Sequence, residues 1–195
     1  MEPVDAIPYP RERPPAPGRL RLVQRFVNTV DYEHGREMLH GPERLRALLV
    51  DLGLLPAGTR VTAADLLAAH ELREALRAHA LANNGPRSRA RPDPAATAVL
   101  ERFAADGGLV VRFDARGGAT LEPPEPGVRG AFAALVGIVY TAVADGTWPR
   151  LKACSRDVCG WLFYDRSRNR SARWCQMAVC GNRTKTRAYR ARRRG

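Results

Sequence analysis

The four cysteines are the residues best suited to chemistry in this 195-residue sequence, and all of them lie near its carboxyl end. They form two close pairs in the pattern C-x4-C-x15-C-x4-C: Cys154, Cys159, Cys175 and Cys180. Soft thiolates supplied as two close pairs are ligands that a tetrahedral zinc ion takes in small protein modules. The alternatives are two disulfides or four unrelated buried thiols. We expect one zinc ion bound by all four cysteines.

Four thiolates would saturate this ion and leave no position for water or substrate, so we expect a structural site. The surrounding segment has few apolar residues, and metal binding would supply the folding free energy that burial cannot. On this interpretation, removing zinc unfolds the segment and spares the rest of the chain.

The positive charge is concentrated in the same segment. Residues 150–195 contain 14 Lys or Arg against two acids, Asp157 and Asp165. The first 149 residues contain 18 basic and 18 acidic residues, so the whole net charge of +12 belongs to the carboxyl-terminal segment. This distribution is typical of a polyanion-binding module attached to a neutral domain.

The residues after Cys180, GNRTKTRAYRARRR, predict a basic helix. Four guanidinium groups fall along one stripe, and two further cations widen it: Arg183, Arg187, Arg190 and Arg194, then Lys185 and Arg192. Like charges at this spacing repel one another, so an anionic partner is the simplest physical reason to tolerate them. Nucleic acid is favoured over a solvated basic tail.

The elements that must position these residues are predicted to be short. Residues 161–164 predict a strand or hairpin between the cysteine pairs, followed by a turn. Asp165 and Asn169 in this turn are expected to bond backbone amides rather than to do chemistry.

The rest of the chain predicts a mostly helical α+β domain. Residues 1–18 include six prolines and predict a disordered or extended tail. Apolar spacing predicts helices from Leu20, from Pro42 to Gly53, and from a capping box at Thr62 and Asp65 to Asn83. A basic loop at 86–94 precedes a helix capped by Asp93. Alternation at 109–114 and 119–122 predicts a β-hairpin, and a buried helix follows at about 128–144.

We therefore predict three parts: a disordered tail at 1–18, an α+β domain at 19–148, and a small treble-clef-like zinc finger with four cysteine ligands at 149–195. The junction at Trp148 and Pro149 is very short, which favours rigid docking of the finger.

Signals for an enzyme or a membrane protein are weak. The four histidines are scattered, and HELRE at 70–74 lacks the second histidine of a metalloprotease motif. The longest uncharged run, 130–144, has 15 residues, against the roughly 20 that a membrane-spanning helix needs. Residues 1–17 lack the apolar core of a signal peptide. We expect a cytoplasmic protein that is not an enzyme and has no membrane partner.

One polar cluster, Asn28, Thr29 and Asp31, follows the first apolar helical stripe. These side chains could cap the helix end or line a pocket. If the amino-terminal domain senses a small-molecule effector, this cluster is the predicted wall of its pocket.

Two stretches of the sequence resemble known families. Residues 150–193, with both cysteine pairs, LFYDRSRN and the tetrapeptide Cys180, Gly181, Asn182 and Arg183, resemble the CGNR zinc finger. FVNTVD at 26–31, LRALLVDLGLL at 45–55 and LREALR at 72–77 resemble the ABATE domain that usually precedes this finger. The resemblance implies a bacterial, stress-induced transcription regulator whose finger binds DNA and whose four cysteines bind zinc.

The sequence as a whole thus favours a zinc-dependent, DNA-binding transcription regulator with an amino-terminal domain for sensing or dimerisation. The basic helix fits the major groove, with Arg183 and Arg187 at base edges and residues 190–194 on phosphates. A single finger buries little surface, so we expect a homodimer on duplex DNA. Two alternatives stay open: an RNA-binding zinc protein, and an interaction module that docks on an acidic protein partner.

Overall fold

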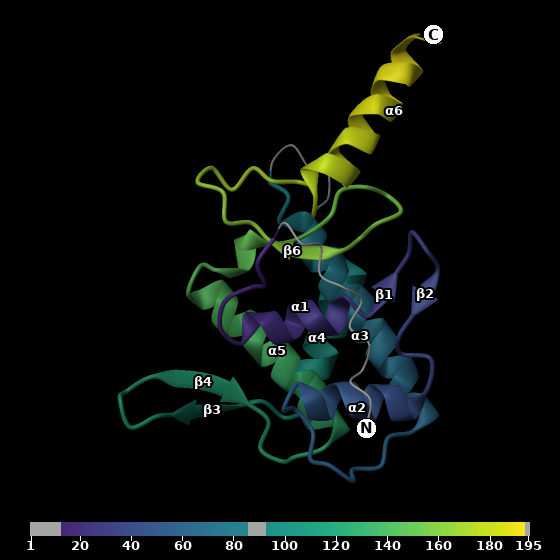
Figure 1. Ribbon diagram of the computed structural model, residues 1–195. Helices are drawn as coiled ribbons and strands as arrows, with labels where there is room; N and C mark the ends of the chain where they lie inside the picture. Colours follow the sequence, from purple (N-terminus) through teal and green to yellow (C-terminus); the bar gives the residue numbers. More distant parts are fainter. Residues whose placement is uncertain (1–12, 86–92, 194–195) are drawn as a thin grey trace.

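The computed structural model describes residues 13–85 and 93–193 (Figure 1). Residues 1–12 of the predicted tail, most of the predicted basic loop and Arg194 lie outside this range. The helices of the amino-terminal body are α1 (Leu20–Val27), α2 (Pro42–Asp51), α3 (Ala63–Ala82), α4 (Pro94–Asp106) and α5 (Val128–Ala144). The strands form antiparallel pairs: β1 (Val30–Asp31) with β2 (Arg36–Glu37), β3 (Val110–Phe113) with β4 (Ala119–Glu122), and β5 (Leu151–Ala153) with β6 (Leu162–Tyr164). This arrangement confirms the α+β prediction.

Local capping sets where the helices begin. The Thr62 hydroxyl accepts a hydrogen bond from the Asp65 amide at 3.2 Å, and the Asp65 carboxylate accepts one from the Thr62 amide at 2.8 Å. This reciprocal capping box starts α3, as the sequence predicts. Asp93 caps α4, and Pro94 occupies its first position, where a missing amide hydrogen costs nothing.

The core of the body lies around α5. Phe132 packs between Phe26 and Phe103, with ring centroids 6.4 and 5.5 Å away. Gly137 lets β4 approach α5, because a Cβ atom there would lie 2.5 Å from the Leu121 carbonyl oxygen. Although α5 is apolar along most of its 17 residues, no helix within 13–85 or 93–193 is long and apolar enough to cross a bilayer. The uncharged run is a buried core helix, as predicted.

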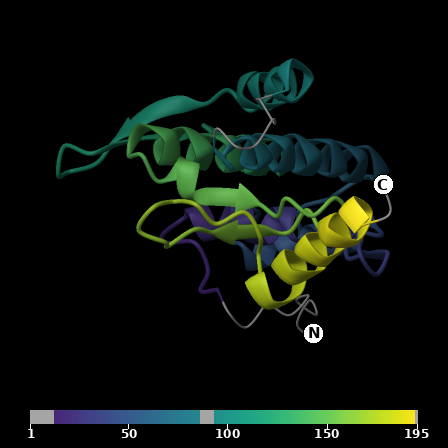
Figure 2. The ribbon, with the colours of Figure 1, turned by 90° about the horizontal axis from the view of Figure 1, so that it is seen from above.

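The β3–β4 hairpin extends beyond α5 in both views of the molecule (Figures 1 and 2). Its strand β4 packs on α5. All four residues of β3 are exposed, and Phe113 keeps 79% of its surface accessible. The body therefore presents an apolar strand to its surroundings.

The β5–β6 pair belongs to two cores, and we call residues 151–164 the shared hairpin. Leu162 and Tyr164 of β6 pack in the core of the helical body. Trp161 and Phe163, which alternate with them, pack around the cysteines. Successive side chains of a strand point to opposite faces, so this short element is a wall between the two cores. The strand at 161–164 was predicted, whereas its partner β5 was not.

Residues 13–18, the part of the predicted disordered or extended tail that the structure describes, are packed against the protein. Ala16 is buried, and its amide donates to the Gln24 side chain at 2.7 Å. Arg13 donates to the Cys175 carbonyl at 2.9 Å and lies over the Phe163 ring at 4.7 Å. Prolines exclude a helix here, but they do not prevent extended chain from packing.

Candidate metal centre and nucleic-acid interface

The structure brings together the four predicted metal ligands. The sulfur atoms of Cys154, Cys159, Cys175 and Cys180 all lie within 4.8 Å of one another. Two of the separations, Cys159 to Cys175 and Cys175 to Cys180, are 3.7 Å. Four sulfurs at about 2.3 Å from a tetrahedral zinc ion are about 3.8 Å apart. The thiols are free rather than disulfide-bonded, so this donor set fits a single tetrahedral metal ion.

Two structural elements supply the ligands. Cys154 follows β5 and Cys159 precedes β6, so both lie in the loop of the shared hairpin. Cys175 precedes the π-helical turn η2 (Met177–Gly181), and Cys180 lies within this turn, which continues into α6 (Asn182–Arg193). A metal bound by all four would fix the start of α6 against the shared hairpin, which is a treble-clef-like arrangement.

The surroundings of Cys180 favour the ionised ligand. Hydrogen bonds from the three neighbouring thiols, with a further one from Arg156, hold the pKa of Cys180 well below the ordinary thiol value. The Arg156 Nη1 atom lies 3.9 Å from the Cys180 sulfur. A thiolate is the form that binds metal, so Cys180 is suited to a cation. Hydrogen bonding within the cluster raises the pKa values of Cys159 and Cys175, so metal binding must displace their protons.

A buried ion pair supports the finger from within. Lys152 and Asp165 keep only 1% and 0% of their side chains exposed, and the ammonium lies 2.8 Å from the carboxylate. Lys152 also donates to the carbonyls of Arg170, at 2.5 Å, and Ala172, at 3.1 Å. All the ammonium donors are thus used, which is the condition for burying this charge without a large penalty.

Asp165 also organises the turn that follows β6. Its carboxylate accepts hydrogen bonds from the amides of Ser167 at 2.9 Å and Ala172 at 3.0 Å. Burial raises the pKa of Asp165, but hydrogen bonds from Lys152 and Ser167 outweigh it and leave the pKa below its usual value. The predicted role of Asp165 in bonding turn amides is confirmed. Its pairing with Lys152 was missed, since a lysine 13 residues earlier forms no recognisable motif.

Side-chain amides of the helical body dock the finger. Asn28 makes two bonds to Leu162 of β6, accepting from its amide at 2.7 Å and donating to its carbonyl at 2.9 Å. Asn83 donates to the Leu151 carbonyl at 2.8 Å, and Asn84 to the Ala153 carbonyl at 2.8 Å. Both strands of the shared hairpin are therefore bonded to the body, which agrees with the rigid docking expected from the short junction.

Arg77 reaches the same junction from α3. Its guanidinium donates to the carbonyls of Gly160 and, at 2.8 Å, Val27. Gly160 has a φ of +58°, and a Cβ atom there would lie 3.3 Å from the Arg77 side chain. Glycine is therefore favoured at this position both by its backbone conformation and by the close approach of Arg77.

The polar cluster predicted as a pocket wall has another role. Asn28 holds β6, and the Thr29 hydroxyl donates to the Phe26 carbonyl at 2.9 Å. Asp31 accepts from the amides of Glu33 and His34 and contacts the His34 ring at 2.7 Å. The protein itself uses these polar atoms, which argues against a ligand pocket formed by Asn28, Thr29 and Asp31.

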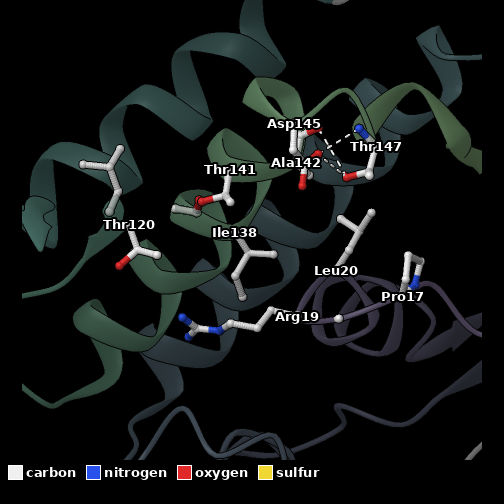
Figure 3. Close-up of a pocket in the computed structure, with 12 residues that line it drawn as sticks. Pro17, Arg19, Leu20, Thr120, Ile138, Thr141, Ala142, Asp145 and Thr147 are labelled. Atoms are coloured by element: carbon white, nitrogen blue, oxygen red, sulfur yellow. Dashed lines mark hydrogen bonds between the residues drawn. The ribbon is translucent and has the colours of Figure 1, made fainter. Parts of the chain in front are cut away.

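A cavity of about 250 Å³ lies elsewhere in the body, between residues 17–20, β4 and α5 (Figure 3). Leu20 and Ile138 give it apolar walls, and Arg19 and Asp145 lie toward opposite ends. Arg19 pairs with Glu122 at 3.6 Å. No pattern in the sequence signals this cavity, because its walls come from three distant segments.

The predicted basic helix is present as α6. Figure 1 shows it rising away from the rest of the molecule, and Figure 2 looks down from the end where it projects. Arg183, Lys185, Arg187 and Arg190 are all exposed. Arg183 also pairs with Glu33 of the body, and Arg187 lies 4.0 Å from Asp157. The stripe is thus accessible along α6 but contacts the body at its first arginine.

Comparisons with known proteins agree with this two-part arrangement. Residues 20–149 match the family described as "Putative stress-induced transcription regulator", or ABATE, and residues 150–193 match the CGNR zinc finger. These bounds lie within two residues of the domain limits predicted from the sequence. No curated protein matches the chain significantly. The chain therefore belongs to the ABATE family and has a CGNR zinc finger at its carboxyl end.

Proposed function

We propose that this protein is a zinc-dependent, DNA-binding transcription regulator. The observation that carries the proposal is α6, a 12-residue helix that has no acidic residue and projects from the metal site. A helix of this length is marginal in water, and its own charges repel one another. A polyanion would offset this repulsion, and a helix fits the major groove of duplex DNA, which is about 12 Å wide.

Zinc is the metal that we assign to the four cysteines, since it accepts a complete set of thiolates in tetrahedral geometry. When bound, the ion supplies folding free energy and fixes the start of α6. We assign no catalytic step to this site, because four protein ligands leave no open position on the metal.

The first test is selection of bound sequences from a random duplex DNA pool at about 150 mM salt, where non-specific polyanion binding is weakened. Zinc-loaded protein is compared with zinc-stripped protein. We expect the zinc-loaded protein to select a defined motif, particularly an inverted repeat, and the zinc-stripped protein to select none. Retention without a motif would redirect the proposal to RNA, and no retention would favour a protein-interaction module.

The amino-terminal body is proposed to sense a ligand, and the 250 Å³ cavity is the better candidate for its site. Pro17 and Gly18 line this cavity, and the chain preceding them contacts the finger through Arg13. A bound effector would therefore touch a segment that leads directly to the metal site. The test is a thermal-shift screen of small molecules, with Ile138→Phe as the variant that partly fills the cavity.

Dimerisation is proposed to use the β3–β4 hairpin. β3 presents Val110, Val111 and Phe113 to solvent at the edge of a two-stranded sheet. Exposed apolar edge strands readily pair with another strand. Pairing of two copies would place two fingers on one DNA site. A second finger would add binding surface, which is needed because a single finger buries little surface on DNA.

A further inference from the structure

A groove beside the metal site gathers arginines from both halves of the finger. It has a volume of about 550 Å³ and lies between residues 155–158 and the first turns of α6. Three arginines line it, Arg156, Arg183 and Arg187, against one acid, Asp157. We call this the arginine groove. Its charge and concave shape suit an anion that offers several oxygen atoms.

A carboxylate from the helical body reaches these arginines. Glu33 lies in the turn between β1 and β2, and its Oε2 atom accepts a hydrogen bond from Arg156 Nη1 at 2.7 Å. Its Oε1 atom accepts one from Arg183 Nη1. The two oxygens of a single carboxylate therefore join an arginine of the hairpin loop to an arginine of α6. The Glu33 side chain is only 23% exposed.

The turn that presents Glu33 is itself well defined. The Asp31 carboxylate accepts hydrogen bonds from the amides of Glu33, at 3.1 Å, and His34, at 3.2 Å. Hydrogen bonding from Arg156, the largest cause, lowers the pKa of Glu33 below its usual value. Glu33 is thus held as an ionised carboxylate at the edge of the arginine groove.

A phosphodiester has the same recognition chemistry as this carboxylate. Each offers two anionic oxygens, and guanidinium groups bind both in the same forked manner. The position of the Glu33 oxygens therefore marks a place where one phosphate could bridge Arg156 and Arg183. Glu33 and a phosphate cannot hold the same guanidinium hydrogens at once, so the two would compete.

We propose that the arginine groove is a phosphate-binding site and that Glu33 occupies its arginines when nucleic acid is absent. The inference rests on the proposed function, because nucleic acid would supply the phosphate. It adds Arg156 to the interface and assigns Arg183 to a phosphate rather than to a base edge. The helical body thereby restrains the finger through one side chain, and any movement of the β1–β2 turn changes the affinity for DNA.

The test compares Glu33→Gln with Glu101→Gln, which removes the same charge from an exposed position on α4. Affinity for duplex DNA is measured by fluorescence anisotropy at fixed salt, with zinc content and melting temperature as checks of folding. We expect Glu33→Gln to bind duplex DNA roughly fivefold more tightly than the wild type. This factor assumes that Glu33 leaves the groove free in about a fifth of wild-type molecules, since apparent affinity scales with the fraction that can bind. Glu101→Gln should match the wild type. Equal affinities for the two variants would overturn the competition.

A second pair of variants tests the groove itself. Arg156→Ala is expected to weaken binding on all sequences alike and to reduce the slope of log affinity against log salt by about one. Arg156→Lys, which keeps the charge, should retain most of that slope. An unchanged affinity and slope for a zinc-loaded Arg156→Ala protein would remove Arg156 from the interface.

A nucleic-acid-free probe separates this inference from the proposed function. Inorganic pyrophosphate is titrated into the full chain, and the Nε–Hε resonances of the arginines are followed by NMR. If no nucleic acid binds, the proposed function fails. Tighter pyrophosphate binding by Glu33→Gln than by the wild type would still support the groove, whereas no binding by either protein would refute it.

Discussion

The helical body and the finger fold by different physical means. In the body, α1, α3, α4 and α5 bury a continuous apolar core, and acidic and basic residues balance. In the finger, three of the five buried residues that form the second core are cysteines, and the charge is strongly positive. The body has a large apolar core to bury, whereas the finger has few apolar residues and, on the proposed function, needs a bound metal as well as a few fully satisfied polar groups.

The two regions nevertheless meet in one element. Leu151 and Leu162 lie within the span of the zinc finger family, yet their side chains are part of the body's core. The difference between the regions is therefore one of chemistry, and the shared hairpin joins them mechanically.

Removing the metal is expected to have the largest effect on the stability of the two regions. Structural zinc contributes about 10–16 kcal/mol to the folding of small finger peptides. Chelation, or Cys175→Ser, should unfold the finger and also lower the melting temperature of the helical body, because the body loses part of its docked hairpin. Circular dichroism melts follow the unfolding of the finger and of the body, and metal content is measured alongside them. Ser171→Ala serves as a control. An unchanged body transition would restore the simpler expectation that only the finger unfolds.

The second-largest effect on stability is expected at the buried ion pair. The two lysines of the sequence allow a matched comparison of a buried with an exposed positive charge. Lys152→Met leaves the buried Asp165 carboxylate without its cation, and breaking a buried pair in this way costs about 3–5 kcal/mol. Lys185→Met removes the same charge from the exposed face of α6 and should change stability by less than about 0.5 kcal/mol. Urea unfolding measures the free energy of unfolding of both variants. Similar losses of stability would mean that the buried pair contributes no more than a surface charge.

A smaller effect is expected at the docking surface. Asn28→Ala leaves the buried amide of Leu162 without its acceptor, which costs about 1–3 kcal/mol. Hydrogen exchange at the Leu162 amide should accelerate, and Asn169→Ala, at an exposed turn, should leave it unchanged. Unaltered exchange in Asn28→Ala would indicate that the finger is docked by its apolar face alone.

The smallest effect on stability is expected at β3. Phe113 is 79% exposed, so Phe113→Ser should change the free energy of unfolding by less than about 0.5 kcal/mol. If two copies pair through the hairpin, the same substitution should shift the protein from dimer to monomer in sedimentation velocity. A wild-type protein that sediments as a monomer would dismiss β3 as the dimer interface.

Features encoded locally were predictable from the sequence. The capping box at Thr62, the apolar stripe from Leu20, and the alternation around Gly117 and Gly118 each need only neighbouring residues, and each element is present. The cysteine pairs were recognisable because metal ligation restricts residue type and spacing together.

Features that depend on distant residues were not predictable. Glu33 meets Arg183 across 150 residues of chain, and Asn28 meets Leu162 across 134. No periodic pattern in the sequence indicates such long-range pairs. A polar residue after a helix could equally cap it, line a pocket or bond another domain, and only the tertiary arrangement decides among these roles.

The shared hairpin also limits how freely the two parts can be exchanged between proteins. Inserting one residue before Leu162 would turn Leu162 and Tyr164 toward the metal and Phe163 toward the helices. A chimera joined between residues 149 and 150 therefore needs more than a working zinc site. The incoming finger must also complete the hydrophobic core of its host, so the two parts fit together as a pair rather than as interchangeable modules.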